Sequence, residues 1–265
     1  MSASPSPSSI VADPLQQHAA ANKRRAATLL AAIGAAVFVV LWLILAVVGL
    51  PLVGLVLAAA VAGGMVALLL SQADGYALGR VGAVPADPLV HARFHNLVEG
   101  LCAAAGLPKP SLHVLEDEDA PNALALGREP RTASLVVTSG LLEKLSRIEL
   151  EGVVAHELTH VKSCDTHVST IALATVGRVA PGLVAKAVGG PRESLADVTG
   201  VSLTRYPPGL ISALEKLRDD PSVLRSSDSA LAHLWIEAPV TDPRSLRSKD
   251  SRPPLEERIQ ALREL

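Results

Sequence analysis

Two histidines and a glutamate on one predicted helix have the spacing that most clearly points to chemistry. The pentapeptide His156-Glu157-Leu158-Thr159-His160 has the pattern H-E-x-x-H. Residues four apart share one face of a helix, so both imidazoles can bind a single ion. Zn²⁺ accepts neutral imidazole, and a catalytic zinc site usually has three protein ligands and one open position. Because Glu157 is placed to take a proton from a zinc-activated water, the pattern predicts metal-dependent hydrolysis.

A zinc site of this kind needs a third protein ligand, and a second acidic pattern offers one. Glu193-Ser-Leu-Ala-Asp197 follows Pro191, a residue type that favours the start of a helix. Alone, Glu193 and Asp197 could form an ordinary exposed acidic helix face. Since the H-E-x-x-H pattern lacks a third ligand, we assign that role to Glu193 and expect Asp197 to orient a ligating histidine. Asp165 is a further candidate for such an acceptor, although a structural role at a helix end is equally open.

Composition limits the classes of protein to which the chain can belong. The formal net charge of the 265 residues is −2, so no broad nucleic-acid-binding surface and no nucleic-acid partner are expected. The two cysteines, Cys102 and Cys164, form no disulfide framework and are typical of a reducing compartment. Hydrophobic residues make up 49% of the chain, which is high for a soluble protein, and much of this excess lies between Ala26 and Leu70.

The hydrophobic excess forms two runs that could each cross a membrane. Residues 26–50 and 52–70 contain no charged side chain, and Pro51 separates them. Each run matches the roughly 20 residues that cross about 30 Å of hydrocarbon. A buried core hairpin is the alternative, but core helices are rarely apolar on every side. A cleaved signal peptide fits poorly, because its apolar core has roughly 7–15 residues. We therefore predict a two-helix transmembrane hairpin.

Basic residues predict how this hairpin is oriented. Lys23-Arg24-Arg25 precede the first run, and the link between the runs carries no charge, so the positive-inside rule places the N-terminus in the cytoplasm. Two crossings return the chain to the same side. We expect a disordered Ser-, Pro- and Ala-rich tail over residues 1–25, a hairpin over 26–70, and a cytosolic domain over 71–265 at the inner face of the cell membrane.

Short strands and helices alternate in the predicted cytosolic domain. Strands are expected over 111–115 and 134–138, with a possible edge strand over 122–127. Helices are expected over 88–105, over 140–145, and from about Ser146 through His160 towards Cys164. Ser146 and Glu149 have the S-x-x-E spacing of a capping box and mark the start of the helix that carries the H-E-x-x-H pattern.

Five blocks follow one another in an order that is far more specific than H-E-x-x-H alone. They are P-N-A-L-A-L-G at 121–127, the stretch 141–165 around H-E-x-x-H, E-x-x-A-D at 193–197, residues 210–217, and P-P-L-E-E-R-I at 253–259. Together with the paired apolar runs, these blocks resemble the HtpX-type and CAAX-prenyl-protease-type family of integral-membrane zinc metallopeptidases. The resemblance covers nearly everything from residue 26 onward.

The resemblance implies a gluzincin-type, zincin-like α+β fold that is mainly helical, with a small sheet and a separate helix that bears the third ligand. It implies His156, His160 and Glu193 as ligands of one Zn²⁺ per chain, with Glu157 as the general base. Asn122 would lie on or near the edge strand, where an extended peptide substrate adds as a further strand. The implied activity is that of an endopeptidase acting on membrane-associated protein substrates, in the quality control of membrane proteins. Processing of CAAX substrates fits less well, because the multi-span chamber expected for lipidated substrates is missing.

The chain departs from the family pattern at Arg252, which stands where family members usually have a histidine before Pro-Pro. An arginine could replace that histidine as a hydrogen-bond donor to an oxyanion, or its presence could impair activity. An alternative function therefore stays open, namely a catalytically weak or inactive relative that acts as a membrane scaffold or binding protein.

A second departure lies between the two site patterns. HtpX-type members usually have two further spans there, whereas residues 167–190 offer only 24 residues and two crossings need about 40. A single crossing would place Glu193 across the membrane from His160. We therefore predict that residues 168–190 do not cross the membrane and form a helical hairpin that is soluble or lies at its surface.

Overall fold

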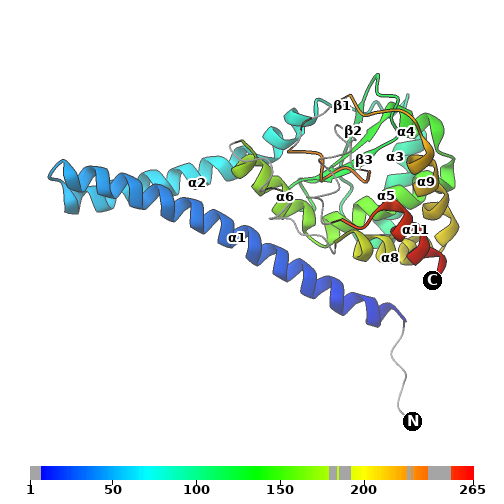
Figure 1. Cartoon of the computed structure of the whole chain (residues 1–265), viewed down its shortest axis with the longest axis horizontal. Coiled ribbons are helices and arrows are strands. Elements are labelled where there is room, and N and C mark those ends of the chain that lie inside the picture. The colour runs from blue at the N-terminus through cyan, green and yellow to red at the C-terminus, as the bar shows by residue number, and fades with distance from the viewer. Residues whose placement is uncertain (1–6, 179–183, 185–191, 226–227, 229, 238–251) are drawn as a thin grey trace, which may run out of the picture.

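The structure is a computed structural model and describes residues 7–178, 184, 192–225, 228, 230–237 and 252–265. It has two parts, a long hairpin of two helices and a domain in which helices surround a small sheet (Figure 1). This is the predicted architecture of a mainly helical α+β domain preceded by two apolar helices.

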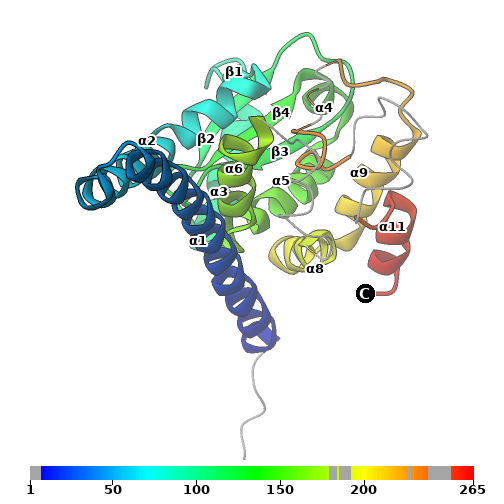
Figure 2. The same ribbon diagram turned by 60° about the vertical axis from the view of Figure 1, so that its left-hand side comes forward.

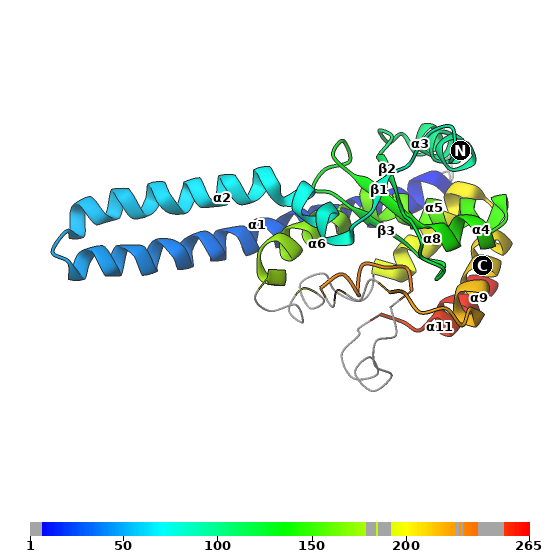
Figure 3. The same cartoon turned by 90° about the horizontal axis from the view of Figure 1, so that it is seen from above.

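The hairpin consists of α1 (Pro7–Val47) and α2 (Pro51–Val81), which pack against each other and project from the domain (Figure 3). Pro51 is the first residue of α2, where its missing N–H loses no helical hydrogen bond. Both helices are long and apolar enough to cross a membrane. Val47 and Leu52, near the tip, are 89% and 82% exposed, which suits a surface that faces lipid. The two predicted spans correspond to these helices.

The prediction of a disordered tail is wrong for residues 7–25, which belong to α1. Their composition lacks an apolar period, but one face of this part of the helix is buried. Leu15, Asn22 and Ala26 lie on that face, and Ala26 packs with apolar residues of α6 (Asp165–Ala174). Contact with the domain therefore stabilises a helix that composition alone does not predict.

The sheet has four strands in the order β1-β2-β4-β3. β2 and β4 pair in parallel, while β1 pairs antiparallel with β2 and β3 pairs antiparallel with β4. The strands are β1 (Val84–Pro85), β2 (Ser111–Leu115), β3 (Ala123–Leu126) and β4 (Ser134–Thr138). The predicted strands 111–115 and 134–138 have these bounds, and the possible strand at 122–127 does lie at an edge.

The remaining helices of the domain surround this sheet. They are α3 (Ala92–Ala105), α4 (Ser139–Lys144), α5 (Arg147–Lys162), α8 (Arg192–Thr204), α9 (Pro207–Asp219) and α11 (Leu255–Arg263), with a short 3-10 helix η1 (Val176–Arg178). α3 begins four residues later than predicted, because Asp87 accepts a hydrogen bond from the Leu89 backbone N–H and closes a turn there. The predicted capping box is present: the Ser146 N–H donates to Glu149 Oε2 at 2.7 Å, and the Glu149 N–H donates to Ser146 Oγ.

α5 lies at the centre of the domain, with β3 on one side and α8 and α9 on the other (Figure 2). Two glycines allow this close packing. A Cβ at Gly152 would lie 2.7 Å from the Leu210 backbone nitrogen, and a Cβ at Gly200 would lie 2.9 Å from the His156 backbone nitrogen. α9 and α8 therefore contact the backbone of α5 directly at these points.

The segment predicted not to cross the membrane falls partly outside the described residues, which omit 179–183 and 185–191. Its first part is α6, which packs against α1, α2, α5 and β3. α6 has only 10 residues and is itself too short to span a bilayer.

Candidate metal centre

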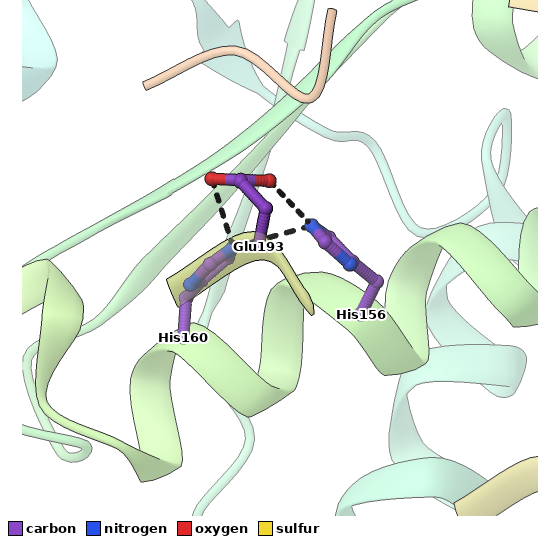
Figure 4. Close-up of side chains that lie close together, drawn as sticks. All are labelled: His156, His160 and Glu193. Atoms are coloured by element: carbon purple, nitrogen blue, oxygen red, sulfur yellow. Dashed lines mark hydrogen bonds and ion pairs between the residues drawn. The ribbon is translucent and has the colours of Figure 1, made fainter. Parts of the chain in front are cut away.

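The structure brings His156, His160 and Glu193 together from two helices (Figure 4). α5 presents the two histidines one turn apart on the same face, and the first turn of α8 presents the glutamate. One potential ligand atom from each residue lies within 4.8 Å of the others. The two Nε2 atoms are 3.2 Å apart, and Glu193 Oε2 lies 3.4 Å from His156 Nε2. All three side chains are buried, so the cluster is a compact set of two nitrogen donors and one carboxylate.

Each histidine has its own carboxylate partner on the other side of the ring. His156 Nδ1 lies 2.8 Å from Asp197 Oδ1, and His160 Nδ1 lies 2.9 Å from Asp165 Oδ2. An ionised carboxylate only accepts hydrogen bonds, so both Nδ1 atoms carry the proton and both Nε2 atoms present lone pairs. With both imidazoles neutral, these two Nε2 atoms, 3.2 Å apart, turn their lone pairs to the same space, which a proton or a metal ion can occupy. The donor set therefore fits a zinc ion.

The charges around the cluster also favour a divalent cation. Its buried carboxylates are Glu157, Asp165, Glu193 and Asp197, and its buried guanidinium groups are Arg192 and Arg258. When all six groups are ionised, they leave two negative charges in excess. Although burial opposes protonation, hydrogen bonds to Asp197 and Glu193 raise the pKa of His156 to about 9. The site therefore attracts positive charge, as protons or as a metal ion.

The two arginines hold the acidic side chains in place. Arg258 donates to both oxygens of Asp197, through Nε at 2.8 Å and through one terminal nitrogen at 2.7 Å. Arg192 Nε lies 3.0 Å from Glu193 Oε1. Although burial opposes ionisation, Arg192 and His156 keep the pKa of Glu193 well below its usual value. Glu193 is therefore an anionic ligand whose orientation is fixed before any metal binds.

Glu157 is buried beside the cluster and keeps one oxygen free. Its side chain is 1% exposed, and its Oε2 has no hydrogen-bond partner among the described residues. Burial raises the pKa of Glu157, while the neighbouring histidines oppose that rise. A carboxylate with an open oxygen beside the metal ligands is placed to accept and return a proton.

Comparison of the sequence with known proteins shows the family to which the chain belongs. The model of peptidase family M48 matches residues 88–192. The protease HtpX homolog of Thermoanaerobacter pseudethanolicus is 35% identical over 238 residues, which cover 73% of this chain and 79% of that relative. The chain belongs to peptidase family M48, among the HtpX homologues. The predicted resemblance to this family is thereby confirmed.

Other relatives extend the match along the chain. The HtpX homolog of Tropheryma whipplei is 40% identical over 213 residues, covering 65% of this chain and 72% of its own. That of Streptococcus gordonii is 30% identical over 301 residues, covering 95% of this chain and all of its own length. Among solved structures, the crystal structure of S. mikatae Ste24p aligns with 78% of this chain and 64% of that chain, with a TM-score of 0.42 and 16% identity.

Membership of the HtpX homologues indicates the kind of metal site that this cluster forms and the class of substrate. The His-His-Glu set is typical of a zinc peptidase, and the family implies protein substrates. The two long apolar helices, together with the family, indicate a membrane protein.

Asn122 and Arg252 both contact one segment of this HtpX homologue, residues 230–237, which we call the edge segment (orange in Figure 1). Asn122 Nδ2 donates to the Glu237 carbonyl at 2.8 Å, and the Glu237 N–H donates to Asn122 Oδ1 at 3.2 Å. The Ile236 N–H donates to the Ala123 carbonyl at 2.9 Å. The edge segment therefore pairs with the start of β3, on the side away from β4.

The Arg252 guanidinium donates to carbonyl groups of the edge segment, to Trp235 at 2.8 Å and to His233 and Ala232 at 3.4 Å. It thus holds this segment in place beside the metal centre. The same segment is linked to the centre itself, because Arg192 donates to the His233 carbonyl and Arg258 donates to the Ile236 carbonyl.

Four residues of the site were not predicted from the sequence. Arg192 directly precedes Glu193, and Arg258 lies in the E-E-R-I block, so a signal for both was present in the sequence. The other two, His18 and Asn22, contact Asp165 from α1. They lie in the part of the chain whose composition predicts disorder, and no spacing links them to the H-E-x-x-H pattern.

Proposed function

We propose that this HtpX homologue is a membrane-anchored endopeptidase that binds one Zn²⁺ per chain through His156, His160 and Glu193. The observation that carries the proposal is the buried cluster of the two Nε2 atoms, 3.2 Å apart, with the Glu193 carboxylate beside them. The nearby Glu157 has an oxygen without a hydrogen-bond partner among the described residues, so it can act as a proton acceptor, which supports a hydrolytic function.

The residues of the site divide the work of peptide hydrolysis. A zinc ion bound here supplies a Lewis acid that polarises the scissile carbonyl and lowers the pKa of a water. Glu157 takes a proton from the attacking water as the new C–O bond forms. It then returns a proton to the leaving amine nitrogen as the C–N bond breaks. Asp197 and Asp165 keep the two imidazoles in the tautomer that presents Nε2 to the ion.

The outer edge of β3 supports binding of an extended peptide. Because the Ala123 carbonyl points away from β4, the N–H and carbonyl of Ala125, two residues further on, point the same way. The edge segment already pairs with Ala123. A substrate strand would therefore pair with Ala125, between the edge segment and Gly127, whose N–H donates to Thr170 Oγ1.

The proposed location is the cytoplasmic face of the cell membrane, with membrane-associated proteins as substrates and their quality control as the role. Lys23, Arg24 and Arg25 precede the apolar part of α1, and the hairpin returns the chain to the side from which it started. A reporter that is active only in the cytoplasm should be active when it is fused after Leu265. Activity of a reporter that requires export would place the domain on the other side.

The test is hydrolysis of casein by the full-length, zinc-loaded protein in detergent. Glu157→Gln should keep the metal and lower turnover by at least about 100-fold, because it removes the proton acceptor. Glu151→Gln, which changes a partly exposed glutamate on the same helix, should leave turnover unchanged and serves as the matched control.

A folded, zinc-replete protein that does not cleave casein or other unfolded proteins would contradict the proposal. It would favour the alternative of an inactive relative that acts as a membrane scaffold. Arg252→His would then show whether the histidine usual in the family restores turnover.

A further inference from the structure

The part of α1 that precedes the apolar run is packed against the catalytic domain through one face. Leu15, His18, Asn22 and Ala26 recur at intervals of three or four residues and therefore lie on the same side of the helix. Asn22 is 1% exposed, although it is polar and lies outside the domain in the sequence. A buried amide requires specific hydrogen-bond partners, and these partners show what the contact does.

The partners of Asn22 lie at the junction between α5 and α6. Its Nδ2 donates to Asp165 Oδ1 at 2.7 Å and to the Ser163 carbonyl at 3.0 Å. His18 Nε2 lies 3.0 Å from the same Asp165 oxygen. Between Ser163 and Asp165, Cys164 has a φ of 58°, a left-handed conformation that is costly for a residue with a side chain. Asn22 therefore bonds to the chain on both sides of an unfavourable turn.

Asp165 connects this junction to the metal centre. Its Oδ2 accepts from Ser163 Oγ at 2.6 Å and lies 2.9 Å from His160 Nδ1. Two partners on α1 thus occupy one oxygen of the carboxylate, and two partners near the end of α5 occupy the other. A carboxylate that is bound on both oxygens cannot rotate without losing hydrogen bonds, so its orientation towards His160 is fixed.

We propose that Asn22 and His18 are positioning residues of the zinc site, which hold Asp165 in the orientation that presents His160 to the metal. The inference rests on the proposed zinc function and extends it. The helix that anchors the protein also completes the support of one zinc ligand. Without the α1 donors, Asp165 Oδ1 becomes a buried anionic atom that lacks partners, and the carboxylate must turn or draw in water. Either change loosens His160.

A double-mutant cycle in zinc affinity tests this inference. The full-length protein in detergent is titrated with zinc against a competing chelator, as wild type, Asn22→Leu, Asp165→Asn and the double variant. Loss of an outer-shell partner typically weakens metal binding 10- to 100-fold, and Asn22 acts one step further out. We expect Asn22→Leu to weaken zinc binding by about 10-fold in the wild-type background. In the Asp165→Asn background it should change zinc binding by less than about 2-fold, because the residue through which it acts has already lost its charge.

Two further variants distinguish a specific effect on zinc binding from a general loss of folding. Gln16→Leu changes an exposed residue on the same helix and should leave zinc affinity unchanged. His18→Ala removes a partner that is 23% exposed and therefore disturbs packing less, and it should weaken zinc binding in the same direction as Asn22→Leu.

Unchanged zinc affinity in both α1 variants would overturn the inference, and so would an equal loss with and without Asp165. Failure of the wild type to bind zinc at all would instead overturn the proposed function, and this inference with it. Zinc binding and casein cleavage by the wild type therefore separate the two failures.

Discussion

The two histidines of the metal centre are supported by different parts of the molecule. His156 is oriented by Asp197 of α8, which Arg258 of α11 holds with two charge-assisted hydrogen bonds. His160 is oriented by Asp165, whose remaining partners are Ser163 and two residues of α1. The support of His156 thus lies wholly within the domain, whereas the support of His160 extends into the membrane anchor. The zinc site is therefore a property of the whole chain rather than of its catalytic domain alone.

The largest effect is expected from breaking the support of His156 at Arg258. Arg258→Met leaves the buried carboxylate of Asp197 without its guanidinium partner and removes one of the two guanidinium groups beside Glu193. Removal of one partner from a buried ion pair typically costs about 3–5 kcal/mol. Thermal inactivation of the purified protein should occur at a clearly lower temperature, with less bound zinc. Arg263→Met, which breaks an exposed ion pair on the same helix, is the control and should change little.

A matched pair of substitutions compares the two supports directly. Asp197→Asn and Asp165→Asn should each weaken zinc binding by about 10- to 100-fold, since each removes the acceptor that orients a ligand. The loss should be greater for Asp197→Asn, because that change also removes the charge of the nearer of the two carboxylates that face the buried Arg258. Chelator competition measures both affinities. A greater loss for Asp165→Asn would reverse the ranking of the two supports.

Moving α8 away from α5 should disturb His156 more than His160, because α8 carries Asp197, the residue that orients His156. A Cβ at Gly200 would lie 2.9 Å from the His156 backbone nitrogen, so Gly200→Ala must move α8 and with it Glu193. Overpacking of this kind typically costs about 1–3 kcal/mol. Thermal stability and zinc affinity should both fall. Gly100→Ala, where nothing lies within 4 Å, should have the opposite sign and raise stability slightly.

The smallest effect on the metal centre is expected at the start of α5, in the hydrogen-bond network of Glu149. Burial raises the pKa of Glu149, but the hydrogen bonds from Lys216 and Ser212 outweigh burial and lower this pKa to about 2. A carboxylate whose pKa is lower in the folded state contributes stability that is fully present above about pH 4.5 and is lost as the pH falls towards 2.

Glu149→Gln should therefore flatten the pH dependence of thermal stability below pH 4.5, while zinc affinity at neutral pH stays unchanged. Glu151→Gln on the same helix is the control and should keep the wild-type pH dependence. An equal pH dependence in wild type and Glu149→Gln would show that this network does not contribute to acid stability.

Features that depend on local sequence could be predicted, and features that depend on distant contacts could not. The capping box at Ser146, the strands 111–115 and 134–138, and the break at Pro51 follow from short-range rules that the structure obeys. The helical spacing of His156 and His160 places them on one face for the same reason.

The residues that complete the site required the folded chain. Asn22 and Asp165 are 143 positions apart, and nothing in the sequence around Asn22 marks it as buried. Similarly, the pairing of Ile236 with the edge of β3 joins segments that share no pattern. Composition showed that residues 7–25 are rich in Ser, Pro and Ala and lack an apolar period, but tertiary contact decided their conformation.

The continuity of α1 links the metal centre to the thickness of the bilayer. From Asn22 to Val47 the helix contains no proline and rises about 1.5 Å per residue, so it is a stiff rod that joins the proposed membrane span to Asp165. A bilayer that is thinner or thicker than the apolar length is accommodated in part by helix tilt. Zinc affinity in nanodiscs should therefore vary with lipid chain length in the wild type and vary less in Asn22→Leu. In this way hydrophobic mismatch, a mechanical property of the membrane, would reach the ligand geometry of a metal centre outside the apolar helices.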